Sequence, residues 1–169
     1  MRARDLGTPD ALWPIVWSVL HLAKVLSAAL IGRTPAARGA APRAIAAAWV
    51  VVAAGIALLA LATRDLVVLV WIGAVVIGAG TGAREPLEKA LVRVRAPENA
   101  RGRAFGAYHL VTGLCALPAG LGVGLLWERT AAGTMGFVEA GRLALFASAG
   151  VVVTAAFLLV AVELARRAR

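Results

Sequence analysis

The sequence predicts an all-α protein: a polytopic membrane helix bundle with five transmembrane helices in one membrane domain, residues 1–169. The composition gives the first reason. Of the 169 residues, 61% are hydrophobic and 16% are charged, whereas soluble domains are about 45–50% apolar and about 25% charged. The mean hydropathy of +0.83 agrees. The second reason is that the apolar residues gather in five runs, each long enough to cross a hydrocarbon core of about 30 Å.

The five runs are residues 11–31, 44–62, 66–93, 104–126 and 143–162. They do not alternate polar and apolar residues, as the strands of a membrane barrel would. A backbone inside the bilayer must satisfy its own hydrogen bonds, so each run is predicted to be a helix. The second and fifth runs contain no ionisable residue and are predicted only as spans.

The first run contains two polar side chains, His21 and Lys24, which are i,i+3 neighbours on one helical face. A lysine within a span is costly and usually faces a partner or water, so both residues are transport-path candidates. A snorkelling lysine beside a packed histidine is the structural alternative.

The third run ends in a charged stretch, Arg84, Glu85, Glu88 and Lys89. Arg84 and Glu88 are i,i+4 neighbours on a helix, and so are Glu85 and Lys89. One interpretation is therefore a self-paired helix end at the cytoplasmic interface. Carboxylates within a span are also typical of solute or proton sites, which makes Glu85 and Glu88 transport-path candidates.

Depth along the helices links this stretch to the first run. Glu85 lies about 19 residues into its run, about 28 Å along the axis and toward the cytoplasmic end, and Lys24 lies at a similar depth. We predict an ion pair between Lys24 and Glu85 or Glu88, with proton coupling as a consistent mechanism. Pro86 lacks a backbone donor and crowds the carbonyl of Gly82, so a kink is predicted there.

Glycines recur at a spacing of four residues in two runs. Gly78 with Gly82, and Gly120 with Gly124, form small-xxx-small faces that predict close helix packing. A nucleotide-binding loop is a poor alternative, because no strand precedes the glycines and no GK[ST] follows them. In the fourth run, Tyr108 and His109 are predicted to be a structural aromatic pair near the interface.

Loop charges predict the orientation. Residues 32–43 and residues 93–103 each carry a net charge of +3, and the C-terminal tail carries +2, whereas the loops on the other side sum to zero. Basic loops stay in the cytoplasm. The N-terminus is therefore predicted to lie outside and the C-terminus in the cytoplasm.

Reporter fusions test this orientation. A reporter that is active only in the cytoplasm should be active when fused after Arg43 and inactive when fused after Asp65. An alkaline phosphatase fused at the same two positions, active only outside, serves as the control and should give the reverse pattern. Finding residues 33–43 outside would contradict the predicted topology.

The composition also disfavours several function classes. Cys115 is the only cysteine, and the two histidines, His21 and His109, are scattered, so neither an intramolecular disulfide nor a metal site is predicted. No nucleophile–base pair stands out, so the chain is not expected to be an enzyme, and no cofactor is expected. The arginines lie in short loops, which fits membrane topology better than nucleic-acid binding.

The run GTGAREPLEKALVRVRAPENARGRAFG, residues 80–106, resembles a hallmark of the major facilitator superfamily of transporters. Its loop follows the pattern P-E-x-x-R-G-x-A-x-G with Pro97, Glu98, Arg101, Gly102, Ala104 and Gly106. WSVLHLAK, residues 17–24, resembles the eighth helix of a bacterial subgroup of these transporters. The loop at 32–43 departs from the family pattern, because Ala36 and Ala37 replace its acid and the following arginine.

This resemblance implies that the five helices correspond to helices 8 to 12 of a twelve-helix transporter in a bacterial cytoplasmic membrane. Such a chain would move a small-molecule solute, with protons as a possible coupling ion, by alternating access. It would lack the N-terminal half and would need a homodimer or a separately encoded half. An inactive fragment and a small membrane accessory or scaffold protein are the alternatives. The sequence does not predict the substrate.

Overall fold

The computed structural model describes residues 6–7, 9–35, 42–133 and 136–168, which form helices joined by turns. The long helices are α2 (Trp13–Gly32), α4 (Pro42–Leu61), α5 (Val68–Arg95), α6 (Arg101–Ala132) and α7 (Phe137–Arg167). Two short 3-10 helices, η1 (Asp10–Leu12) and η2 (Glu98–Ala100), precede α2 and α6. All five long helices are long and apolar enough to cross a membrane. The predicted all-α class and the number of candidate spans are confirmed.

Two helices extend well beyond the predicted apolar runs. α6 begins three residues before the run at 104–126 and ends six residues after it, and α7 exceeds the run at 143–162 at both ends. Hydropathy marks only the apolar part of a helix, whereas backbone hydrogen bonding continues through polar turns. Charges favour these added turns: Glu139 lies in the first turn of α7 and Arg129 in the last turn of α6, each complementing the helix dipole.

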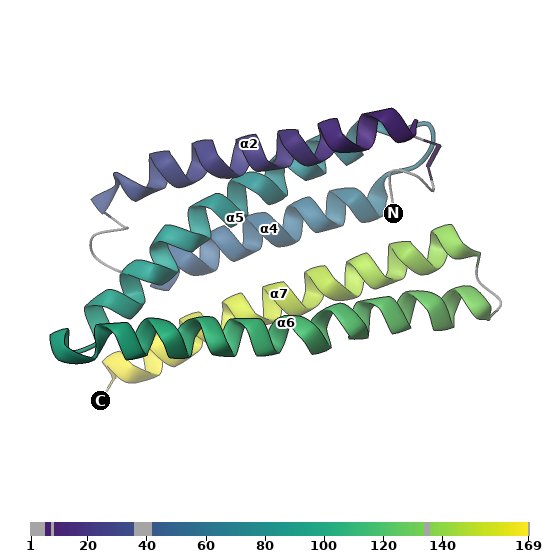
Figure 1. The fold of residues 1–169 in the computed structure, drawn as a ribbon. Coiled ribbons are helices and arrows are strands. Elements are labelled where there is room, and N and C mark those ends of the chain that lie inside the picture. The colour runs from purple at the N-terminus through teal and green to yellow at the C-terminus, as the bar shows by residue number, and fades with distance from the viewer. Residues whose placement is uncertain (1–5, 8, 36–41, 134–135, 169) are drawn as a thin grey trace.

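The helices pack in an order that differs from their order in the chain. α5 lies between α2 and α4, α7 packs against α4, and α6 packs against α7 (Figure 1). The start of α2 and the end of α7 lie at opposite ends of the bundle, as an odd number of antiparallel helices requires (Figure 1). We call the end where α5 finishes and α6 begins the basic end, because Arg93, Arg95, Arg101 and Arg103 lie there.

Glycines let α5 approach two neighbours at once. A Cβ added to Gly82 would meet the backbone carbonyl oxygen of Lys24 in α2, and one added to Gly78 would meet that of Leu20. On the other side of α5, a Cβ on Gly80 would lie 2.8 Å from the backbone nitrogen of Val52 in α4. The small residues thus place α5 in backbone contact with both helices.

The other glycine pair has no comparable neighbour. Gly120 and Gly124 are exposed on α6, and a Cβ on either would meet nothing within 4 Å among the described residues. No residue of α6 is buried within the chain. The close packing predicted for Gly120 and Gly124 therefore stays a prediction that needs a partner outside this chain.

α5 continues through Pro86 as one helix of 28 residues. The family departures at Ala36 and Ala37, in the loop before α4, lie outside the described residues.

Candidate functional site

The predicted ion pair between the first and third runs is present. Lys24 Nζ on α2 lies 2.6 Å from Glu85 Oε1 on α5, with both side chains about one-third exposed. The close packing at Gly82 brings the two backbones together one turn away, and Ser27 of α2 donates a hydrogen bond of 2.7 Å to the Ala79 carbonyl of α5. Of the two predicted partners of Lys24, the structure selects Glu85.

Glu88 has a different set of partners, drawn from three helices. Trp49 of α4 donates its indole N–H to Oε1 at 2.8 Å, and Tyr108 of α6 donates its hydroxyl to Oε2 at 2.7 Å. Arg84 Nε, one turn earlier on α5, lies 3.6 Å from Oε1. The Glu88 side chain is only 11% exposed, so each carboxylate oxygen accepts a hydrogen bond in a site that is largely shielded.

Only one of the two ion pairs predicted within the end of α5 is present. Arg84 and Glu88 are close, as the i,i+4 spacing predicted. Glu85 instead reaches across to Lys24, and no ion pair joins it to Lys89 among the described residues. Interhelical contact has therefore replaced one of the two local pairs, which the sequence spacing of α5 alone could not reveal.

The cluster lies near the midpoints of the helices that carry it. Lys24, Trp49 and Arg84 each lie within three residues, about 4 Å, of the midpoints of their own helices. Glu85 is about 5 Å from the midpoint of α5. The sequence placed Glu85 toward the cytoplasmic end because it lies about 28 Å from the start of the run at residue 66. α5 begins at Val68 and has 28 residues, longer than a hydrocarbon core of about 30 Å.

A cleft of about 570 Å³ borders this cluster between α5 and α6. We call it the polar cleft, and it is lined by Arg84, Glu85, Glu88, Lys89, Tyr108, His109, Thr112, Cys115 and Ala116. On α6 the lining residues follow the i, i+4, i+7 spacing of one helical face. Ionisable and hydroxyl side chains therefore face an open volume in the middle of an otherwise apolar bundle.

The remaining predicted path residue, His21, lies apart from the cluster. Its ring is exposed, lies 4.5 Å from the Trp17 ring between centroids, and its Nδ1 is 3.0 Å from the Trp17 carbonyl oxygen. Among the described residues it makes no hydrogen bond or ion pair with Lys24 or Glu85. Of the two candidates of the first run, Lys24 therefore belongs to the cluster and His21 does not.

The residues of the loop motif lie at the basic end. Pro97 precedes η2, and Arg101 pairs with Glu98 at 3.2 Å. Gly102 and Gly106 are exposed, with nothing within 4 Å of an added Cβ. Close by, Arg95 of α5 and Glu163 of α7 form an ion pair of 2.8 Å. The motif forms a surface turn and does not line the polar cleft.

The sequence did not predict two members of the site: Trp49 was not singled out, and Tyr108 was predicted only as an interfacial aromatic residue. The signal that could have found them is the need of a carboxylate inside a span for donors at its own depth. The ring of Tyr108 also contacts His109, 5.1 Å away between centroids. Among the described residues, no group of three His, Cys, Asp or Glu side chains could hold a metal ion.

Comparison of this chain with protein-family models, with curated proteins and with solved structures finds no match.

Proposed function

We propose that this chain forms part of a membrane transporter of the major facilitator type, which moves a small polar or charged solute by alternating access. The observation that carries the proposal is the charged cluster of Lys24, Arg84, Glu85 and Glu88, placed at mid-helix beside the polar cleft. The resemblance of residues 80–106 to the family supports the same function.

The energetic argument rests on the cost of placing ionised side chains inside a bilayer. An ionised side chain at the centre of a bilayer costs about 2.5–3.5 kcal/mol on insertion scales, and such residues usually face a cavity and serve a function. Five helices whose only task was to fill the membrane would not need four charges at mid-helix. In this bundle Lys24 and Glu85 pair across two helices, and Arg84 and Glu88 pair within α5. Arg84, Glu85 and Glu88 border an open volume, as expected for a solute path.

The mechanism follows from how the pairs are arranged. Glu85 is held by a cation of another helix, and Glu88 by neutral donors of two more. Movement of α2 or α6 relative to α5 would change the partners of a carboxylate and so its affinity for a proton or a cationic group. This is the coupling that alternating access requires of a polar site between helices.

A partner is part of the proposal, either a second copy of this chain or a separately encoded half. α6 exposes its full length, including Gly120 and Gly124, and supplies a surface of small residues on which another helix can pack. The same surface favours the second candidate, a membrane accessory or scaffold protein, whose cluster would only join helices together.

Cys115 distinguishes the two functions without knowledge of the substrate. It lies within about 2 Å of the midpoint of α6, lines the polar cleft and is the only cysteine in the chain. A membrane-impermeant charged methanethiosulfonate should modify it from either face of the membrane in right-side-out and inside-out vesicles, because a transport path opens to each side in turn.

The matched control is Cys115→Ser combined with Leu117→Cys. Leu117 is 66% exposed and at nearly the same depth, but it lies about 200° around the helix, away from the cleft. It should react at least about 10-fold more slowly, because the reagent needs water and a thiolate. Equal protection of both cysteines, or reaction of Cys115 from one face only, would contradict the transport proposal.

A further inference from the structure

Arg84 lies where three open volumes meet. Besides the polar cleft, it lines a smaller cleft shared with Trp49, Glu88 and Tyr108, and a third volume between α4, α5 and α7. We call this third volume the Arg84 hollow. It is lined by Trp49, Val52, Arg84, Val151, Val152 and Ala155 and measures about 190 Å³.

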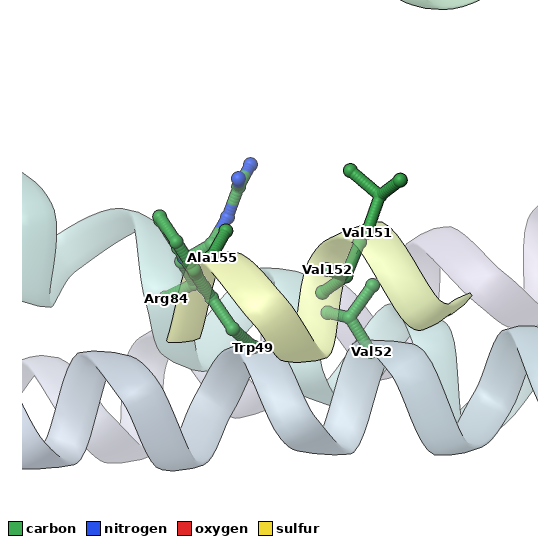
Figure 2. Close-up of a pocket in the computed structure, with 6 residues that line it drawn as sticks. All are labelled: Trp49, Val52, Arg84, Val151, Val152 and Ala155. Carbon is green, nitrogen blue, oxygen red and sulfur yellow. The ribbon is translucent and has the colours of Figure 1, made fainter. Parts of the chain in front are cut away.

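The Arg84 hollow is apolar except for one group. Its other five lining residues are three valines, an alanine and Trp49, whose indole N–H is already donated to Glu88. Figure 2 shows the guanidinium nitrogens of Arg84 directed away from the helix ribbons, toward the side on which Val151 projects. Among the described residues that line this volume, Arg84 therefore carries the only side-chain donors that make no hydrogen bond.

Arg84 lies beside Glu88 but makes no hydrogen bond within the described part of the chain. Arg84 Nε is buried without a hydrogen bond, and its distance of 3.6 Å from Glu88 Oε1 exceeds the 2.7–2.9 Å of a charged hydrogen bond. Hydrogen bonds from Trp49 and Tyr108, one to each oxygen, hold the Glu88 carboxylate in this position. A guanidinium carries five N–H donors in a fork that matches a carboxylate or phosphate.

The surrounding charges leave an excess of one cation. Lys24, Arg84 and Lys89 oppose Glu85 and Glu88, and Lys24 is committed to Glu85 at 2.6 Å. Glu88 repels an anion from one side, but its charge is partly compensated by its two donors. Arg84 is the one ionisable residue among those that line the hollow, so the field there favours a single negative charge placed against its guanidinium.

We propose that the Arg84 hollow binds an organic monoanion, with its acidic group on the guanidinium of Arg84 and a short apolar body against Val52, Val151, Val152 and Ala155. This assignment rests on the proposed transport function only in naming the bound anion as the solute; the binding itself stands on the geometry. The anion is either a water-soluble carboxylate or the acidic head of a membrane lipid, and both present the same chemistry to Arg84.

Three six-carbon probes test the binding on the purified full chain in neutral detergent. Hexanoate should raise the thermal midpoint of unfolding, whereas hexanamide and hexylammonium at the same concentration should not, because only a ligand that binds the folded state stabilises it. Acetate, which has the charge without the apolar body, should bind at least about 10-fold more weakly than hexanoate.

Two substitutions locate the effect. Arg84→Gln should weaken hexanoate binding about 10-fold or more, as expected for the loss of a charged hydrogen bond. Arg93→Gln, the same change at an exposed position of the same helix, should leave it unaltered. Ala155→Phe keeps the cation but fills the hollow, and should also weaken binding, so the result does not depend on the folding of one variant.

Nanodiscs separate the two sources of the anion. If a lipid occupies the hollow, phosphatidylglycerol should stabilise the wild type over phosphatidylcholine alone, and Arg84→Gln should abolish this difference. If a soluble anion does, hexanoate should stabilise the protein in phosphatidylcholine and phosphatidylglycerol should add nothing. Equal responses to hexanoate and hexanamide, with no phosphatidylglycerol effect that depends on Arg84, would overturn the proposal.

The outcome is independent of the test on Cys115. Hexanoate binding through Arg84 in a protein whose Cys115 is protected would refute the transport function and leave the anion site in place. Labelling of Cys115 from both faces, with no discrimination among the three probes, would support the transport function and refute the anion site.

Discussion

Replacing Gly82 with leucine is expected to force α2 away from α5 and to be the most destabilising single change in the chain. Even a Cβ at this position would meet the carbonyl oxygen, carbonyl carbon and Cα of Lys24. Backbone atoms cannot turn aside as a side chain can, so the helices must separate. Overpacking of this kind costs about 1–3 kcal/mol or more, and the Lys24–Glu85 pair, one turn away, should break with it. A titration of unfolding in detergent mixtures measures the loss.

Gly124→Leu is the control for Gly82→Leu. Gly124 is also a helical glycine, but nothing lies within 4 Å of its added Cβ. Leucine there should change the free energy of unfolding by less than about 0.5 kcal/mol, as surface substitutions do. Equal stability of the two variants would show that α2 and α5 are not in backbone contact. A large loss in Gly124→Leu alone would instead indicate a partner on α6.

Replacing Glu88 with leucine is expected to have the second-largest effect, a loss of about 2–3 kcal/mol. The carboxylate accepts hydrogen bonds from Trp49 and Tyr108 and lies 3.6 Å from Arg84 Nε, so its removal leaves two donors without an acceptor and Arg84 without its nearest anion. An unpaired buried donor costs about 1–3 kcal/mol, and water in the adjacent cleft should offset part of the sum. The same unfolding titration measures it.

Two companion variants interpret the Glu88 result. Glu88→Gln keeps one amide oxygen as an acceptor and should lose about half as much stability as Glu88→Leu. Glu98→Leu makes the same change at a side chain that is 87% exposed, and should be nearly neutral. Restoration of stability when Trp49→Phe and Tyr108→Phe are added to Glu88→Leu would support the assignment, because the orphaned donors are then gone. No difference between Glu88→Leu and Glu98→Leu would contradict it.

The sequence predicted the helices well because their apolar content is a local property. It also predicted the contact between Lys24 and Glu85, since two opposite charges at similar depth in an apolar medium strongly favour each other. The rotation of each helix about its axis is not local. Trp49 and Tyr108 therefore went unrecognised as donors to Glu88, although each lies on a predicted helix.

The glycine pairs show the same limit. Gly78 with Gly82 and Gly120 with Gly124 have identical spacing, and nothing in their sequence context distinguishes the two pairs. Within the described chain, only the first pair has a neighbouring backbone against it. A small-xxx-small motif indicates that another helix can approach closely, but it does not identify which helix packs there.

Pro86 interrupts the backbone hydrogen bonding of α5. Proline has no N–H to donate to the carbonyl of Gly82, so the helix lacks one rung of its hydrogen-bond ladder between these residues. The half before this gap is held by Gly78 and Gly80 against two neighbours, and the half after it carries Glu88. The gap lowers the cost of bending α5 at this point. Leu87, which follows the gap, is buried against Ile45 of α4, so a bend there would have to move Glu88 and Leu87 together.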